Sequence, residues 1–245
     1  MKIKRYVIAT ILTGIFVISA NSNVFATTKS ELDRQLPQEV VTLLKQVEQY
    51  QDNKDYKTVL QIADDIIAKY PNNDAVRINA YLAKVPAYIA LYDDENAKRM
   101  IDEAYRLDNN YTVTAYYRGV SLKLEKKYTE AIPYFTKCID EEKGEATASP
   151  YWQRGLCFER LGDYSTALKD HQKAISLKGG QYNYYFSEGY AYFMLKDYEA
   201  AAESFSKTIM HKPNHKRAYL FRAKCYRALG SEQQALQDEN HAKTL

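Results

Sequence analysis

The sequence predicts an all-α fold, a solenoid built from six stacked helix–turn–helix hairpins. Three observations support this prediction. Residues of the same kind recur every 34 positions, small side chains stand where two helices would approach each other, and tyrosines recur at the expected turns. The chain also has only nine glycines and six prolines among its 245 residues, so few positions interrupt long helices.

The 34-residue period divides most of the chain into six units. The stretch 151–155 is followed 34 residues later by the similar stretch 185–189, and after another 34 residues by 219–223. A single hairpin cannot bury its own apolar face, so neighbouring units are expected to stack on one another. The predicted units are 40–73, 78–111, 112–145, 148–181, 182–215 and 216–245, preceded by a tether or short helix at 27–39.

The unit 148–181 shows why each repeat should form a pair of helices. Tyr151 and Gly155 are four residues apart, which places them on one helical face, and Ser149 is the expected N-cap of that helix. The stretch 161–164, Leu-Gly-Asp-Tyr, should end the first helix and form the turn. Gly155 and Ala167 are small because the two helices must approach closely at these positions.

These residues resemble the tetratricopeptide-repeat family, whose pattern sets an aromatic residue first, a small residue four positions later, an alanine in the second helix and a proline near the end. Nearly all of 40–245 follows the pattern, although Asp94 replaces the turn tyrosine in unit 78–111. The resemblance implies a right-handed α-solenoid whose first helices line an inner groove that binds peptides or partner helices. In unit 182–215 the matching residues are Tyr185, Gly189, Tyr192, Tyr198, Ala201, Phe205 and Pro213.

The N-terminus has the pattern of a secretory signal peptide. Lys2, Lys4 and Arg5 form a basic head, and an apolar run follows from Tyr6 to about residue 20. The pattern Val24-Phe25-Ala26 then matches that of a signal-peptide cleavage site. The apolar run is shorter than the roughly 20 residues that a membrane-spanning helix needs. We therefore predict a signal peptide at 1–26, cleavage after Ala26, export to the periplasm or the medium, and no stable membrane span after cleavage.

Charge and motif content argue against several other classes of function. Removing the predicted leader leaves 31 basic and 31 acidic residues, without the basic stripe typical of nucleic-acid-binding proteins. No phosphate-binding glycine loop, nucleophile elbow or metalloprotease helix occurs, and the isolated pair His211 and His215 is a weak metal signal. We expect no enzyme activity, no catalytic residues, no cofactor, no metal and no nucleic-acid partner.

The predicted partner-binding groove is formed by residues one position around the helix from the core face of each first helix. Its middle is rich in aromatic side chains, and its C-terminal end is basic. Aromatic anchors dominate the binding energy of many interfaces. The alternative interpretation is that these rings fill the space between adjacent hairpins. The predicted groove residues are Tyr116, Tyr117, Val120, Trp152, Leu156, Phe186, Tyr190, Phe193, Phe221, Lys224 and Arg227.

One well-known use of the family's groove, clamping a C-terminal carboxylate, requires lysine and asparagine at paired positions of consecutive units. In this sequence those positions carry residues such as Leu82, Pro86, Tyr116 and Val120. The sequence therefore lacks that clamp.

Two arginine–aspartate pairs recur with the period. Arg154 and Arg222 each precede an aspartate, Asp170 and Asp238, by 16 residues, which places each arginine opposite the aspartate of the same hairpin. We expect ion pairs within the hairpins rather than a ligand clamp.

The three cysteines are expected to behave as small buried hydrophobic residues. Cys157 and Cys225 lie two units apart, too far for a disulfide. A bond between Cys138 and Cys157, on consecutive helices, is left open by the sequence.

The sequence thus favours a non-enzymatic scaffold or adaptor of the cell envelope that binds a peptide or helix of a partner protein in an aromatic groove. One alternative is a self-associating structural module whose groove is filled by residues 27–39 or by a second copy of the chain. Another is a carrier for a small apolar or glycan ligand. The identity of the partner is not encoded in any recognisable motif.

Overall fold

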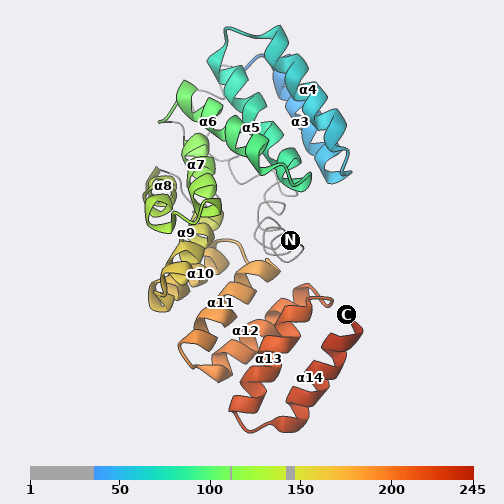
Figure 1. The fold of residues 1–245 in the computed structure, drawn as a ribbon, viewed down its shortest axis with the longest axis vertical. Coiled ribbons are helices and arrows are strands. Elements are labelled where there is room, and N and C mark those ends of the chain that lie inside the picture. The colour runs from blue at the N-terminus through green and yellow to red at the C-terminus, as the bar shows by residue number, and fades with distance from the viewer. Residues whose placement is uncertain (1–35, 111, 142–146) are drawn as a thin grey trace. The chain divides into compact units, whose positions relative to one another are not determined.

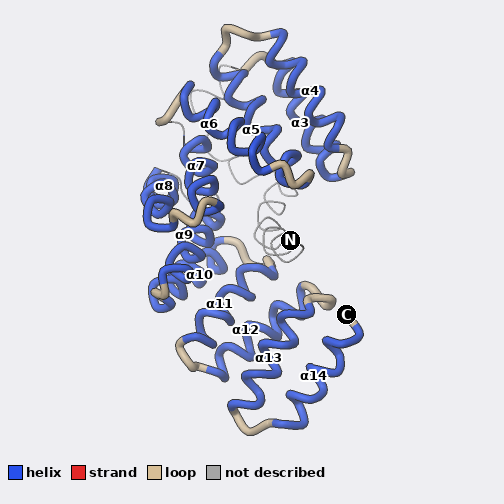
Figure 2. The backbone as a smooth tube through the Cα atoms, viewed as in Figure 1, coloured by secondary structure: helices blue, strands red, loops and turns tan. Residues whose placement is uncertain are grey.

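A computed structural model describes residues 36–110, 112–141 and 147–245, which form twelve α-helices and no strand (Figures 1 and 2). The predicted cleavage site and most of the predicted tether lie outside these residues. The prediction of an all-α fold made of stacked helix pairs is confirmed. The helices are α3 (Gln38–Asp52), α4 (Tyr56–Lys69), α5 (Asp74–Ala90), α6 (Asp94–Leu107), α7 (Thr112–Leu124), α8 (Tyr128–Glu141), α9 (Ala148–Leu161), α10 (Tyr164–Leu177), α11 (Tyr182–Met194), α12 (Tyr198–His211), α13 (Lys216–Ala228) and α14 (Glu232–Thr244).

The described helices form two compact units, α3 to α8 and α9 to α14, which we call the N-terminal and C-terminal units. Each contains three hairpins, α3–α4, α5–α6 and α7–α8 in the first, and α9–α10, α11–α12 and α13–α14 in the second. Within the C-terminal unit, α11 contacts both α9 and α13, so the first helices of the three hairpins form one layer. The exposed side of this layer is called the first-helix face below.

All six hairpins use the same turn. The fifteenth residue of each predicted unit adopts a left-handed backbone conformation, with φ between 60° and 85°. Glycine accepts this conformation without strain, whereas a side chain disfavours it. Only two of the six hairpins have glycine there. The six residues are Lys54, Tyr92, Lys126, Gly162, Lys196 and Gly230.

The residue after each left-handed position directly precedes the second helix and stands at its N-cap position. In four hairpins it is an aspartate whose side chain accepts a hydrogen bond from the backbone N–H three residues later, as in the 3.0 Å contact from Thr166 to Asp163. This N-cap satisfies one of the unpaired donors at the helix start. The predicted cap of α9 is wrong, because α9 begins at Ala148 after Thr147, and Ser149 is a buried residue inside the helix.

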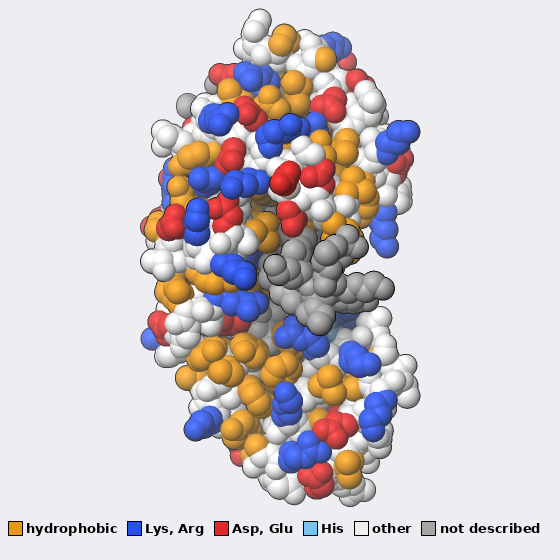
Figure 3. Space-filling view, viewed as in Figure 1, with side chains coloured by type: hydrophobic (Ala, Val, Ile, Leu, Met, Phe, Trp, Pro, Cys, Tyr) orange, Lys and Arg blue, Asp and Glu red, His pale blue; other side chains and the backbone are white. Residues whose placement is uncertain are grey.

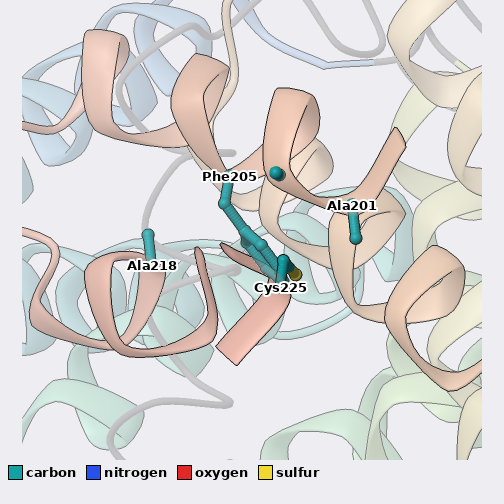
Figure 4. Close-up of a cluster of buried hydrophobic side chains, with 5 residues drawn as sticks. Ala201, Phe205, Ala218 and Cys225 are labelled. Atoms are coloured by element: carbon teal, nitrogen blue, oxygen red, sulfur yellow. The ribbon is translucent and has the colours of Figure 1, made fainter. Parts of the chain in front are cut away.

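Small residues let the two helices of a hairpin approach, as the sequence predicted for Gly155. A β-carbon added to Gly155 would lie 2.5 Å from the His171 ring, and one added to Gly189 would lie 2.9 Å from the Phe205 ring. Phe205 is fully buried in a cluster that includes Ala218 and Cys225 (Figure 4). In the hairpins α7–α8, α9–α10 and α11–α12, the same place therefore combines a glycine on the first helix with a ring on the second.

Neighbouring hairpins of the N-terminal unit are joined by ion pairs as well as by apolar contacts. Lys84 of α5 lies 2.6 Å from Asp64 of α4, and Arg118 of α7 lies 2.5 Å from Asp102 of α6. Each cation is the seventh residue of its unit and each acid is the twenty-fifth residue of the unit before it. The ion pairs thus recur with the repeat.

The cysteines are buried, in agreement with their interpretation as small core residues. Burial raises the pKa of the Cys225 thiol to about 12, which keeps it protonated at neutral pH. The Cys138 thiol donates a hydrogen bond of 3.4 Å to the Thr112 carbonyl.

Candidate functional site

The predicted groove residues of the N-terminal unit lie mainly in its interior. Tyr116 and Val120 are 1% and 0% exposed, and Tyr116 packs against the buried ring of Phe135 with ring centroids 5.8 Å apart. Tyr117 is half-buried and meets Tyr116 edge to face at 5.6 Å. Burial raises the pKa of Tyr117 to about 12. These side chains stabilise α7 and offer little surface to a ligand.

Trp152 is also an interior residue. Its indole is 5% exposed and lies against Tyr184 with ring centroids 5.5 Å apart. Its Nε1–H donates a 2.9 Å hydrogen bond to the Ser187 hydroxyl, so both its apolar body and its polar atom are satisfied by α11. Leu156 packs against the same cluster and is half-buried. Trp152 therefore joins two hairpins.

The other predicted aromatic residues form one cluster on α11 and α13. Phe221 of α13 stands at its centre, with ring centroids 5.9 Å from Phe186, 5.5 Å from Tyr190 and 5.4 Å from Phe193. All four rings are half-buried, so each packs on the core below and keeps part of its surface accessible. Hydrophobic side chains gather over α11 and α12 in Figure 3, with basic side chains over α13.

Basic side chains border this cluster. The guanidinium carbon of Arg217 lies 5.0 Å from the centroid of Phe186, and the Lys224 ammonium lies 4.9 Å from that of Phe221. Both side chains are exposed and rest on the aromatic rings as cation–π partners. Arg227 differs, because its guanidinium binds the carboxylates of Glu232 and Glu239, the latter at 2.8 Å. Of the two predicted groove cations, Lys224 borders the rings and Arg227 is held by α14.

Two polar residues of this face were not singled out as site residues from the sequence. The His215 ring is the N-cap of α13, and its Nδ1 accepts a 3.1 Å hydrogen bond from the Ala218 N–H. Burial and the nearby Lys212 charge lower the pKa of His215 to about 4, so the ring is neutral at pH 7. Asn183, in the first turn of α11, has a side-chain amide whose two polar atoms are buried without a hydrogen-bond partner among the described residues.

The two predicted arginine–aspartate pairs are confirmed. Arg154 donates to both carboxylate oxygens of Asp170 at 2.8 and 2.9 Å, and Arg222 does the same to Asp238 at 2.7 and 2.8 Å. In the hairpin between them, Glu188 takes the place of the arginine and accepts a 2.8 Å hydrogen bond from the Ser204 hydroxyl. These bonds hold the two helices of each hairpin together.

Neither a metal-binding cluster nor a membrane-spanning helix occurs among the described residues. The described part of the chain contains no group of three or more His, Cys, Asp or Glu side chains that could hold a metal ion. Of the twelve described helices, none is both long and apolar enough to cross a bilayer.

Comparisons with known proteins place the repeat in a family. The family model of the tetratricopeptide repeat matches residues 148–180 and 182–215, which contain α9–α10 and α11–α12. Hsp70-Hsp90 organizing protein 2 of Arabidopsis thaliana is 26% identical over 163 residues, which cover 66% of this chain and 26% of the relative. The chain therefore spans about a quarter of the length of that curated relative.

Solved structures share the fold at low sequence identity. PilW, a type IV pilus biogenesis factor, superimposes with a TM-score of 0.74 at 16% identity, covering 85% of this chain and 94% of PilW. YrrB, described as a TPR protein with an unusual peptide-binding site, gives a TM-score of 0.56 at 19% identity over 74% of this chain and 90% of its own. The helix pairs, the repeat period and these similarities together show that the chain is a tetratricopeptide-repeat protein.

Proposed function

We propose that the protein is a non-enzymatic scaffold that binds a segment of a partner protein on the first-helix face of its C-terminal unit. The observation that carries this proposal is the cluster of four half-buried rings, Phe186, Tyr190, Phe193 and Phe221, bordered by exposed cations. Rings that are already held by the core lose little conformational freedom when a ligand covers them, which favours binding. YrrB, a protein of the same fold, is described as having a peptide-binding site, and this supports a peptide or helix as the ligand.

We further propose that the protein acts in the cell envelope. The basic head, the apolar run and the cleavage-site pattern Val24-Phe25-Ala26 support export, and PilW, which shares the fold, is a pilus biogenesis factor. N-terminal sequencing of the exported protein tests this. A chain beginning at Thr27 is expected, and a chain that retains Met1 would contradict the cleavage.

The binding proposal is tested by crosslinking and capture from the native envelope fraction. The combined variant Phe186→Ala and Tyr190→Ala should lose the partner, because it removes two adjacent rings of the cluster. Leu220→Glu, which changes an exposed residue of α13, should also weaken capture and does not disturb the core. Met210→Ala is the matched control, since Met210 is 68% exposed on α12, a helix of the second layer.

Circular dichroism should show that every variant is folded before its capture of the partner is compared with that of the wild type. Folded Phe186→Ala/Tyr190→Ala and Leu220→Glu proteins that capture the same partner as the wild type would refute the proposed site.

Light scattering with and without residues 27–39 detects self-association through this face. A thermal-shift screen with small apolar compounds and glycans detects a small ligand, since a ligand of the native state raises the melting temperature.

A further inference from the structure

Helix α13 carries an excess of positive charge. It contains five basic residues and no acidic one, and two of the five are neutralised, Arg222 by Asp238 and Arg227 by Glu232 and Glu239. The others, Lys216, Arg217 and Lys224, are exposed and make no ion pair within the described residues.

The charge of a further cation acts on Arg217. Arg160, at the end of α9, is exposed and has no ion pair in the described part of the chain. Partial desolvation by neighbouring side chains lowers the pKa of the exposed Arg217 guanidinium. The positive charge of Arg160 acts in the same direction, and the charge of Glu159 opposes it. Like charges gathered without a counterion repel one another, and an incoming anion relieves that repulsion.

The acidic residues of the neighbouring first helices α9 and α11, one in each, are already engaged. The Glu159 carboxylate lies 2.8 Å from His171 Nε2 inside the α9–α10 hairpin, and its side chain is 9% exposed. Glu188, the only acid of α11, accepts a hydrogen bond from Ser204. Neither carboxylate forms an ion pair with Arg160, Arg217 or Lys224.

The cations and the aromatic cluster occupy one surface. Arg217 and Lys224 rest on Phe186 and Phe221, so a ligand that reaches either cation also meets a ring. A small inorganic anion would leave the rings uncovered, and a purely apolar ligand would leave the charges without a partner. A segment that combines carboxylates with apolar side chains is complementary to both features.

From this charge complementarity we infer that the first-helix face selects partner segments in which acidic side chains alternate with aliphatic or aromatic ones. This inference rests on the proposed function and specifies its ligand. Arg160, Arg217 and Lys224 bind the side-chain carboxylates, and the rings of Phe186, Tyr190 and Phe221 receive the apolar side chains.

The test uses the full chain and three labelled synthetic peptides of equal length. All three share one pattern of leucine and phenylalanine, and their polar positions are glutamate, glutamine or lysine. Fluorescence anisotropy should show the glutamate peptide binding about ten-fold more tightly than the glutamine peptide and the lysine peptide binding least. The preference should shrink as salt is raised from about 50 to about 500 mM, because salt screens exposed charges.

Substitutions test whether the cations of the first-helix face cause the preference for the glutamate peptide. Arg217→Gln with Lys224→Gln should reduce the difference between the glutamate and glutamine peptides to about two-fold or less, and Lys224→Gln alone should reduce it in part. Lys169→Gln with Lys243→Gln removes the same charge from exposed positions of α10 and α14, and should leave the preference intact.

The results distinguish a failure of the proposed acidic preference from a failure of the proposed binding face. Equal binding of the three peptides, all weakened by Phe186→Ala, would overturn the acidic preference and leave the binding face standing. No binding of the glutamate peptide by the folded chain would also overturn the inference, whereas the binding face would still be judged by partner capture. Loss of the preference in the Lys169/Lys243 control would show that net charge, rather than this surface, causes it.

Discussion

The guanidinium of Arg222 forms a two-pronged ion pair with the carboxylate of Asp238, and both side chains are more than four-fifths buried. The same guanidinium donates a 2.9 Å hydrogen bond to the Ser206 hydroxyl of α12. One residue thus links the two helices of the last hairpin and the hairpin before it.

We predict that Arg222→Met lowers the free energy of unfolding by about 2–3 kcal/mol, because it leaves the Asp238 carboxylate buried without a partner. Urea unfolding measures the change. The double variant Arg222→Met/Asp238→Leu should recover much of the loss, since neither charge remains. The control is Arg227→Met, whose ion pairs are exposed to solvent and should contribute much less to stability. Equal losses in Arg222→Met and Arg227→Met would contradict the prediction.

Gly155→Ala should destabilise the α9–α10 hairpin. The new β-carbon would lie 2.5 Å from Cε1 and 2.8 Å from Nδ1 of the His171 ring, which is fully buried and cannot move away. Overpacking of this kind costs about 1–3 kcal/mol, measurable by urea unfolding. The double variant Gly155→Ala/His171→Ala should lose less free energy of unfolding than the sum of the losses in the two single variants. Strict additivity would show that the methyl group and the ring do not meet.

The left-handed turn residues give a prediction of stabilisation. Lys196 has φ 65°, so Lys196→Gly should raise the free energy of unfolding by about 0.5–1 kcal/mol. Gly162→Ala, at the same place of the previous hairpin, should lower it by about 1 kcal/mol. Lys169→Gly is the matched control, because Lys169 lies inside α10, where glycine destabilises a helix. A loss of stability in Lys196→Gly would refute the argument.

Stability should fall between pH 6.5 and pH 4 in a way that depends on His215. The pKa of His215 is about 4 in the folded chain and 6.5 in the unfolded chain, so the unfolded state binds the proton more readily. The stabilisation of the folded chain that comes from this pKa difference is complete above pH 6.5, and it is lost as the pH falls toward 4. Protonation also removes the acceptor that caps α13.

The effect is measured by urea unfolding at pH 7.5 and pH 5. His215→Asn, which keeps a capping acceptor, should reduce the difference between the two pH values by about 1–2 kcal/mol, after allowance for solvent screening. His241→Asn replaces an exposed histidine of α14 and should leave the difference unchanged. An unaltered pH dependence in His215→Asn would contradict the assignment.

The helices could be predicted from the sequence because the repeat carries its signals within each hairpin. In the last three hairpins the small residue of the first helix (Gly155, Gly189, Ala223) and the turn residue are local features that recur 34 residues apart. The ion pairs Arg154–Asp170 and Arg222–Asp238 were predictable for the same reason, since a fixed interval along a hairpin corresponds to a fixed contact.

The exposure of the groove residues could not be predicted in the same way. Trp152 and Phe186 stand at equivalent places of consecutive units, yet Trp152 is covered by Tyr184 and Ser187 of the next hairpin, whereas Phe186 stays half-exposed beside Phe221. The difference depends on the size and polarity of residues one hairpin further along. The capping role of His215 was missed because histidine is not among the usual N-cap residues.

The turn shared by the described hairpins has a consequence for the evolution of the number and order of repeats. Every described hairpin reverses direction through one left-handed residue at the same place, and glycine, lysine and tyrosine all fill it. A hairpin can therefore be duplicated, deleted or exchanged as a unit without the invention of a new loop. Substitutions of the outward side chains of the first helices would then change the proposed binding surface and leave these turns unchanged.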